Sequence, residues 1–285
     1  MGFKILGWGP AVLLSLTGLV AEVQDLRLVE AAKEGARETL HRLVEEGVDV
    51  NLAPVDGETA LHWAAHRDDL ETAQLLIGAG AEVNAANAYG VTSLSLACTN
   101  RNAEMVEKLL QAGADPNATR WTGETVLMTC ARTGSLTSVK SLLNQGADPN
   151  ARETRWEQTA LMWALAGGHP TVAGALMEHG ADIRARSSQG FTALMFAAQQ
   201  GDGDSVRMLL AAGADLKHST PEHGNVLTVA SGSGHEALAL FLLEKGADPS
   251  SPNGRGVTPL HFAVPEGLST FDGLKYDDFY RVLPP

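Results

Sequence analysis

The sequence repeats itself at a spacing of about 33 residues. A Thr or Asn that is followed two residues later by Leu recurs at intervals of 33, 33, 34, 33, 33 and 33 residues, at Thr59, Thr92, Thr125, Thr159, Thr192, Asn225 and Thr258. A series of glycines recurs in step with it, at Gly47, Gly80, Gly113, Gly146, Gly180, Gly213 and Gly246. Such a period indicates a stack of short supersecondary units, whereas 285 residues would otherwise suggest two globular domains.

Each unit has the apolar spacing of two short helices. The spacing i, i+3 and i+4 occurs twice, first in Leu61, Ala64 and Ala65 and then in Ala73, Leu76 and Ile77. The polar residues 66–69 between them predict a turn. Small alanines on the first helix and leucines on the second favour closer packing on one side. The pattern therefore predicts a curved solenoid in which each unit buries its apolar face against its neighbours.

These motifs resemble the ankyrin repeat. Thr59-Ala60-Leu61-His62 and Thr258-Pro259-Leu260-His261 are similar to the family's Thr-Pro-Leu-His start, and the Gly-Ala-Asp steps are similar to its Gly-Ala-Asp-Val-Asn end. The resemblance covers residues 25–267, about 85% of the chain. It implies an all-α repeat solenoid, an ankyrin array of stacked helix-turn-helix units joined by β-hairpin-like turns. It also implies protein recognition rather than catalysis.

The two ends of the chain depart from the pattern. Leu26-Arg27-Leu28-Val29 replaces the usual start of the first unit, and no Gly-Ala-Asp closes the last one. Terminal repeats with one face in water are expected to differ in this way. We predict an N-terminal capping repeat over residues 22–54, six repeats over 55–253, a partial C-terminal repeat over 254–267 and an irregular tail over 268–285.

Residues 1–21 have the composition of a secretory signal peptide. Lys4 precedes an apolar run from Ala11 to Ala21, which is shorter than the ~20 residues that a membrane-spanning helix needs. We predict cleavage after Ala21 and a periplasmic or secreted protein. The alternative is a retained signal anchor, because Leu19 is larger than the residue usually found there. Membrane contact is expected only in that case.

Cys98 and Cys130 are the two cysteines of the chain, and export would expose them to oxidising conditions. In the repeat register they lie one repeat apart on first helices. Axes of neighbouring helices lie ~8–10 Å apart, whereas a disulfide needs its Cα atoms within ~7 Å. We therefore expect two free, buried thiols.

Composition and motifs argue against nucleic-acid binding and catalysis. Twenty-one Lys and Arg against 34 Asp and Glu give a net charge of −13, which repels phosphate backbones. The sequence contains no nucleotide-binding glycine loop, nucleophile elbow or paired-cysteine zinc motif, so we expect no enzyme activity, cofactor or metal.

Two short motifs have the spacing of metal ligands. His62 and His66 lie four apart on one helix, but the ankyrin resemblance implies a structural hydrogen-bonding role for His62. Asp202-Gly203-Asp204 lacks the further ligands of a calcium loop and is expected to be an inter-helix turn.

The ankyrin resemblance also implies where a partner would bind, because hairpin tips and the exposed ends of the first helices line the concave groove of such arrays. The tip positions hold Glu58, Tyr89, Trp121, Glu124, Arg155, Trp156 and Phe191, and the helix-end positions hold His66, Arg67, Asn100, Arg132, Gln199 and Gln200. Aromatic residues occupy four consecutive tips, and Trp, Tyr and Arg dominate binding interfaces. The alternative is that each ring folds back over a hairpin.

The interval from Thr125 to Thr159 is 34 residues, one longer than the others in the series. The extra residue falls within residues 151–157, at a hairpin tip. Loop tips tolerate insertions and often carry binding residues. Arg152, Arg155 and Trp156 make this tip the most interface-like of the array.

These features predict a monomeric protein-interaction module that binds a protein partner of unknown identity outside the cytoplasm. Two alternatives stay open. In one, the chain is the targeting portion of a larger enzyme or membrane-associated protein that continues beyond Pro285. In the other, it is a self-associating scaffold in a surface layer.

Overall fold

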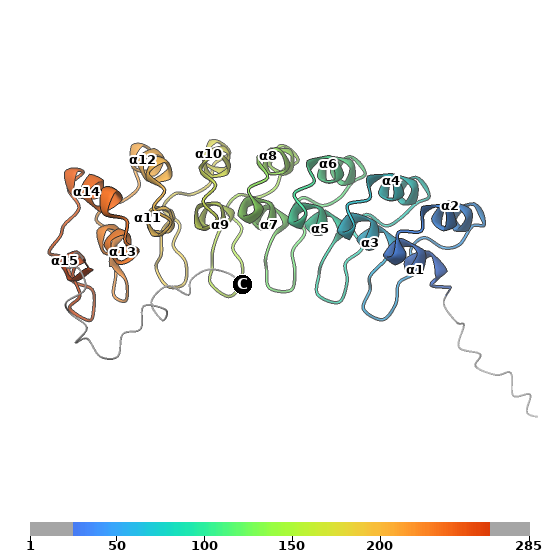
Figure 1. Cartoon of the computed structure of the whole chain (residues 1–285), viewed down its shortest axis with the longest axis horizontal. Helices are drawn as coiled ribbons and strands as arrows, with labels where there is room; N and C mark the ends of the chain where they lie inside the picture. Colours follow the sequence, from blue (N-terminus) through green and yellow to red (C-terminus); the bar gives the residue numbers. More distant parts are fainter. Residues whose placement is uncertain (1–24, 263–285) are drawn as a thin grey trace, which may run out of the picture.

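The structure is a computed structural model that describes residues 25–262. The leader predicted over residues 1–21 and the tail predicted over residues 268–285 lie outside the described residues. Figure 1 shows a bowed row of helix pairs, each stacked on the next. No helix within residues 25–262 is long and apolar enough to cross a membrane.

Two layers of helices form the row. The inner helices, on the concave side of the bow, are α1 (Arg27–Glu34), α3 (Ala60–His66), α5 (Ser93–Thr99), α7 (Val126–Thr133), α9 (Ala160–Ala166), α11 (Ala193–Gln199), α13 (Val226–Gly232) and α15 (Pro259–Phe262). The outer helices, on the convex side, are α2 (Arg37–Glu45), α4 (Leu70–Gly78), α6 (Ala103–Gln111), α8 (Leu136–Asn144), α10 (Pro170–Glu178), α12 (Gly203–Ala211) and α14 (Glu236–Glu244). This is the helical repeat solenoid that the sequence predicted.

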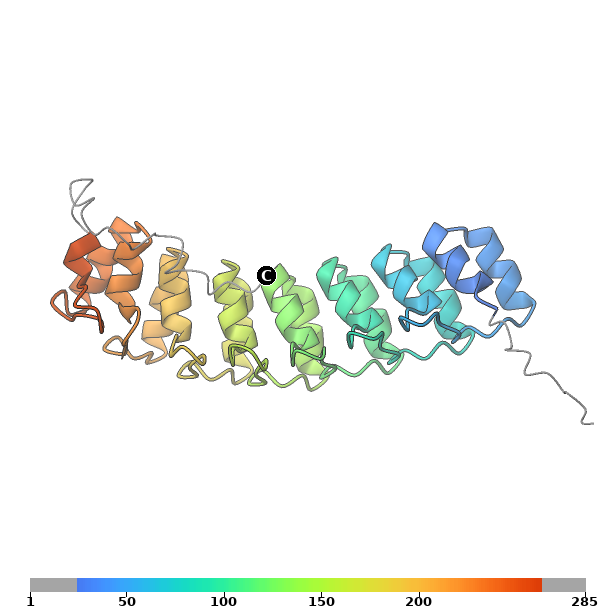
Figure 2. The ribbon, with the colours of Figure 1, turned by 90° about the horizontal axis from the view of Figure 1, so that it is seen from below.

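Hairpin-like loops join each outer helix to the next inner one. In one of them, strands β1 (Ser219–Thr220) and β2 (Gly224–Asn225) pair antiparallel. Isolated antiparallel bridges occur in three others, between Ala86 and Thr92, Thr119 and Thr125, and Arg186 and Thr192. Figure 2 shows the loops following one another along one edge of the array.

The recurring Thr and Gly residues fix where the helices begin and end. Thr59 caps α3, because its hydroxyl accepts the backbone N–H of His62. Thr92, Thr125 and Thr159 cap the equivalent inner helices in the same way. Gly80, after α4, has a φ of 90°, a conformation that side-chain-bearing residues rarely adopt. The Thr series therefore marks where the inner helices begin, and the Gly series marks where the outer helices end.

The core runs without interruption along the array, between the two helix layers. Ala64 and Ala65 of α3 are buried, as is Leu76 of the paired helix α4, so the predicted apolar spacing does face the core. Alanine keeps the inner helices thin where they pack against one another. Each helix pair depends on its neighbours for burial, so stability accumulates along the stack.

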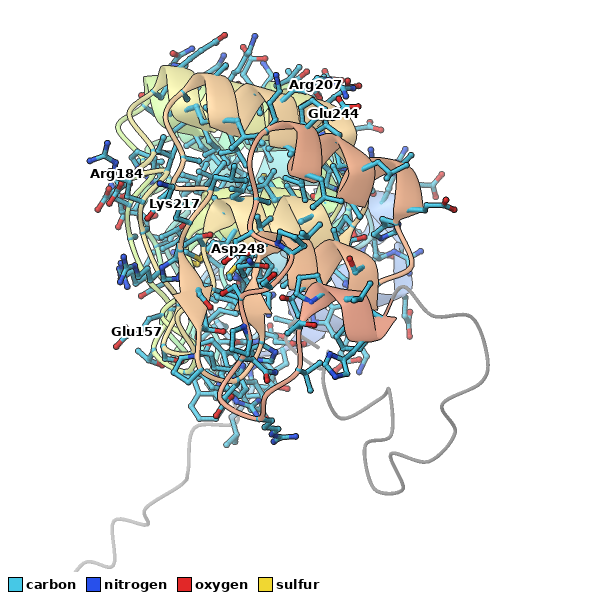
Figure 3. The ribbon with its side chains drawn as sticks, turned by 90° about the vertical axis from the view of Figure 1, so that its left-hand side faces the viewer. Glu157, Arg184, Arg207, Lys217, Glu244 and Asp248 are labelled. Carbon is cyan, nitrogen blue, oxygen red and sulfur yellow. A yellow bond between two sulfur atoms is a disulfide. The ribbon has the colours of Figure 1, made fainter. Side chains whose placement is uncertain are left out.

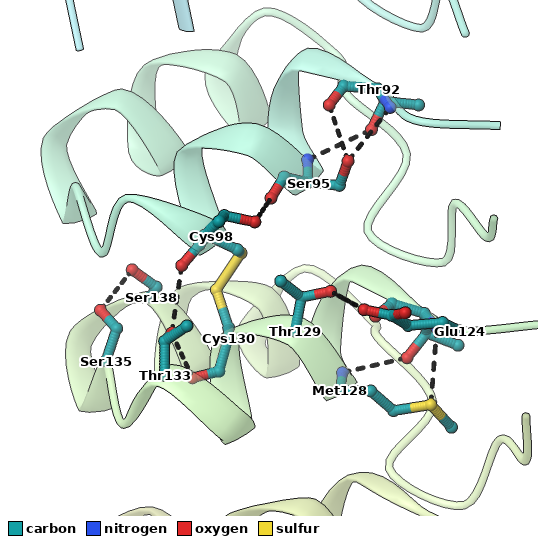
Figure 4. Close-up of a disulfide and its surroundings, with 12 residues drawn as sticks. Thr92, Ser95, Cys98, Glu124, Met128, Thr129, Cys130, Thr133, Ser135 and Ser138 are labelled. Atoms are coloured by element: carbon teal, nitrogen blue, oxygen red, sulfur yellow. Dashed lines mark hydrogen bonds between the residues drawn. A yellow bond between two sulfur atoms is a disulfide. The ribbon is translucent and has the colours of Figure 1, made fainter. Parts of the chain in front are cut away.

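Cys98 and Cys130 form a disulfide between α5 and α7, so the prediction of two free thiols was wrong (Figure 4). Their Cα atoms are 4.7 Å apart. Helix axes ~8–10 Å apart do not exclude this distance, because each Cα stands ~2.3 Å off its axis and facing Cα atoms approach within ~4–5 Å. The hydroxyl of Thr133 lies 3.1 Å from the carbonyl oxygens of both cysteines and links the same two helices.

Candidate functional site

Two aromatic side chains are held outward at neighbouring hairpin tips. The Asn87 side-chain oxygen accepts the backbone N–H groups of Tyr89 and Val91, at 2.9 and 3.0 Å, and closes the first of these tips. The Tyr89 side chain is left 61% exposed, and Trp121 on the next tip is 76% exposed. The backbone N–H of Trp121 donates to the backbone carbonyl of Tyr89 at 3.3 Å, which holds the two tips in register. Both side chains are therefore exposed at their tips, and their contact with a partner stays a prediction.

Val55 is a third exposed apolar side chain, on the preceding tip, and sequence reasoning missed it. It is fully exposed, and the Ala88 N–H donates to the Asp56 carbonyl at 2.8 Å to connect its tip to the next. A signal was present, because Val55 and Trp121 occupy equivalent positions two repeats apart, each two residues before a tip glycine. We call Val55, Tyr89 and Trp121 the tip row.

The tip with the extra residue is organised by a buried carboxylate. Glu153 is 5% exposed, and its carboxylate accepts three backbone N–H groups, from Arg155 and Trp156 at 2.7 Å and from Gln158 at 3.0 Å. The Trp156 ring is half-buried, with the Arg155 guanidinium 5.0 Å from its centre. Arg155 is exposed, so this tip offers a cation rather than a free aromatic face.

Phe191 is not at an exposed tip, and its prediction as a contact residue was wrong. It is fully buried, with its ring 5.4 Å from Phe196 and 4.7 Å from His223. It lies at the base of its hairpin, where its backbone N–H donates to the Ser187 hydroxyl and its carbonyl accepts the Ser187 N–H, and its side chain packs into the core. The aromatic row thus has two exposed rings rather than four.

Glu58 and Glu124 occupy the same base position and turn back onto the protein. Glu124 lies 3.6 Å from the Arg120 guanidinium and accepts the Thr129 hydroxyl at 2.8 Å. Glu58 is half-buried, 3.5 Å from the Asn87 amide. Both side chains therefore interact with residues of the hairpins, and that of Glu124 also with the adjoining helix.

The ends of the inner helices divide into accessible and engaged residues. His66, Arg67 and Gln200 are exposed, whereas Arg132 and Gln199 are half-buried. The Asn100 amide bridges to the previous repeat, donating to the carbonyls of Ala65 and His66 at 3.0 and 2.9 Å.

Two tryptophans of the inner helices, which sequence reasoning did not single out, lie beside these residues. Trp63 is half-buried, with the Lys33 ammonium 5.3 Å from its centre. Trp163 is buried, and the Arg132 guanidinium lies 5.5 Å from its centre. In the described part of the chain, neither the Trp163 indole nitrogen nor the Arg132 Nε has a hydrogen-bond partner.

Comparison with known proteins agrees with this architecture. Family models described as ankyrin repeats (3 copies) match residues 28–120 and 127–220, and a model described as ankyrin repeats (many copies) matches residues 227–273. The chain belongs to the ankyrin-repeat family. The array is similar to the crystal structure of the ankyrin repeat domain of Bcl-3, a unique member of the IkappaB protein family. The two are 30% identical, with a TM-score of 0.62 over 73% of this chain and 94% of that one.

A search of the curated proteins found no matching relative. The family assignment gives this array the class of a protein-interaction module, and the individual partner has to be inferred from its surface.

His62, the first of the two histidines with metal-ligand spacing, has a structural role. His62 is buried, and its Nδ1 accepts the Thr59 N–H at 3.1 Å, which leaves the proton on Nε2 to be donated to the Val91 carbonyl at 2.9 Å. Burial lowers the pKa of His62 and keeps it neutral. Both ring nitrogens are thus occupied, and no group of three potential metal ligands occurs within residues 25–262.

Asp202 likewise has a structural role. Its carboxylate accepts the N–H groups of Asp204 and Ser205, both at 3.1 Å, and caps helix α12. This is the inter-helix turn that the sequence predicted, with a helix cap in place of a calcium loop.

Proposed function

We propose that this ankyrin array binds a protein partner on its concave side, with the tip row Val55, Tyr89 and Trp121 as the anchor. The observation that carries the proposal is the exposure of Tyr89 and Trp121 on adjacent tips. A tip that serves only as a turn needs no aromatic side chain, and Trp and Tyr are the residues that most often dominate binding interfaces.

The tip row is suited to high-affinity contact because its backbone is already ordered. Hydrogen bonds within and between the hairpins order the backbone that carries both rings, so little backbone entropy is lost on binding. Covering ~100–150 Å² of each ring would contribute about 2–4 kcal/mol per ring, which is the range of an interface hot spot. His66, Arg67 and Gln200 supply a polar rim on the inner helices.

We further propose that the partner is met outside the cytoplasm. The Cys98–Cys130 disulfide supports this, since disulfides persist in secreted and periplasmic proteins and are rare where cellular thiols keep cysteines reduced. The apolar run that precedes Ala21 supports it independently.

The test is a comparison of two double variants in a crosslinked capture from an extracytoplasmic extract. Tyr89→Ala/Trp121→Ala removes the anchor, and Glu107→Ala/Lys140→Ala removes two exposed side chains from the outer helices as a matched control. We expect both variants to keep the circular dichroism of the wild type. The first is expected to lose at least ~20-fold in affinity for the captured partner, a loss that corresponds to one hot spot of about 2 kcal/mol.

Equal capture by wild type and Tyr89→Ala/Trp121→Ala would overturn the proposal. Sedimentation of the purified wild type addresses the scaffold alternative, because a monomer at micromolar concentration is the expected result for a module that binds a different protein.

A further inference from the structure

A repeated asparagine clamps each of the early loops to the next. The Asn150 amide donates to the Gly180 carbonyl at 3.0 Å, and its side-chain oxygen accepts the Asp182 N–H at 2.7 Å. The same pair of bonds is made in the three preceding loops by Asn51, Asn84 and Asn117. Each clamp satisfies one carbonyl and one N–H of the neighbouring loop.

The clamp is missing between the loop that contains Arg184 and the next loop, which contains Asp215. Arg184 follows Ala-Asp-Ile where Asn150 follows Ala-Asp-Pro, so an arginine occupies the asparagine position. Among residues 25–262, the Gly213 carbonyl and the Asp215 N–H, which an asparagine would have clamped, have no hydrogen-bond partner. A cavity of about 360 Å³ lies at this point.

The walls of the cavity provide cations and hydrogen-bond donors. Arg184, Arg186, Thr192, Asp215 and His218 are among the residues that line it. The His218 ring donates through Nε2 to the Gly190 carbonyl at 2.8 Å, which fixes it in the wall. The Arg186 carbonyl accepts the Arg152 guanidinium at 2.9 Å, which braces the opposite side.

The two arginines are not neutralised by the protein itself. Neither Arg184 nor Arg186 forms an ion pair with any residue that the structure describes, although the chain carries a net charge of −13. The carboxylates of Asp182 and Asp215 each accept a backbone N–H, from Arg184 and Lys217 at 2.8 and 2.9 Å, and neither forms an ion pair with Arg184 or Arg186 among the described residues.

Lys217 repeats the substitution one loop further on. It occupies the next asparagine position and is exposed, without an ion pair within the described residues. Figure 3 shows Arg184 and Lys217 on the same flank of the array. The positive side chains therefore continue beyond the cavity along one edge.

We propose that this cavity binds an oxyanion, a carboxylate or a phosphate group. The guanidinium groups of Arg184 and Arg186 supply the charge and paired N–H donors that match a planar or tetrahedral oxyanion, and the open Asp215 N–H supplies a third donor. The oxyanion takes over the accepting role that the asparagine side-chain oxygen has toward the equivalent N–H in the other loops. This site lies apart from the tip row and does not depend on the proposed partner.

The test is a titration of the isotopically labelled full chain, followed by NMR, at constant ionic strength maintained with chloride. One arm uses inorganic phosphate and the other a hexaglutamate peptide, so that a free anion and an acidic peptide are distinguished. We expect saturable shifts of the Asp215 and Thr192 amides in at least one arm. Arg186→Gln is expected to weaken that binding about 10- to 100-fold, as for loss of one charge-assisted hydrogen bond.

Arg184→Asn is the decisive variant, because asparagine is the residue that this position carries in four other loops. It is expected to restore the clamp, to leave the fold at least as stable as wild type and to abolish the shifts. Arg207→Gln, on outer helix α12, removes one exposed arginine elsewhere and is expected to leave binding unchanged. Absence of saturable shifts in both arms, or equal binding by Arg184→Asn and wild type, would overturn the proposal.

Discussion

Breaking the Cys98–Cys130 disulfide is expected to destabilise the array by about 3–4 kcal/mol. The bond closes a loop with a sequence separation of 32 residues. In the chain-entropy model such a loop removes about 12 cal/mol/K from the unfolded chain, or about 3.7 kcal/mol at 25 °C. Comparing oxidised with reduced wild type isolates this effect, because the packing atoms are the same in both.

The assay is urea unfolding followed by circular dichroism at 222 nm, with and without a phosphine reductant. With a slope of about 2–3 kcal/mol/M for a chain of this size, the midpoint is expected to fall by about 1–2 M on reduction. The variant Cys98→Ala/Cys130→Ala is expected to be insensitive to the reductant. Hydrogen exchange of the reduced protein should rise first in α5 and α7, because each repeat is stabilised by its neighbours.

Two results would refute this reasoning. Equal midpoints for the oxidised and the fully reduced protein would show that the bond does not constrain the unfolded chain as calculated. Titration of two free thiols in the native, air-oxidised protein would show that the bond does not form.

Further predictions concern a tip residue and a buried histidine. Glu157 has a φ of 54° where most other tips carry glycine, so Glu157→Gly is expected to stabilise the array by about 0.5–1 kcal/mol in urea unfolding, and a lower midpoint would contradict this. The reciprocal change Gly90→Ala puts a Cβ 3.0 Å from the Arg120 Cα at a φ of 74° and should cost about 1–2 kcal/mol. Burial lowers the pKa of His62, so the unfolded chain binds a proton below pH ~6.5 that the folded chain does not, and stability falls as the pH drops through this value. His62→Gln should reduce the slope of the unfolding free energy against pH by up to about 1.4 kcal/mol per pH unit between pH 7.5 and 5.5. An unchanged slope, or the same reduction in the control variant His41→Gln, whose histidine is exposed, would contradict the assignment.

The repeat made most of the fold predictable, because it determines local and nearest-neighbour structure together. The spacing of Leu61, Ala64 and Ala65 predicted the buried face of α3, and the glycine series predicted the helix ends. Sequence reasoning failed where the result depended on distances between repeats. Cys98 and Cys130 were judged by the separation of helix axes, although their Cα atoms face one another.

The candidate site was predictable only in part for a similar reason. Tyr89 and Phe191 both lie in tip hairpins, but one precedes the tip glycine and the other follows it, and that difference decides which ring is exposed. The cavity beside Arg184 became visible only once the Asn150 bonds were seen, since the sequence shows the substitution but not the groups that it leaves unpaired.

The central claim, partner binding through the tip row, is tested most directly by site-specific photo-crosslinking. A photoreactive amino acid is placed in turn at positions 55, 89 and 121, and at the exposed control positions 107 and 140 on the outer helices. One partner is expected to crosslink from the three tip positions and not from the controls. Crosslinking of that partner from positions 107 and 140 but not from the tips would contradict it.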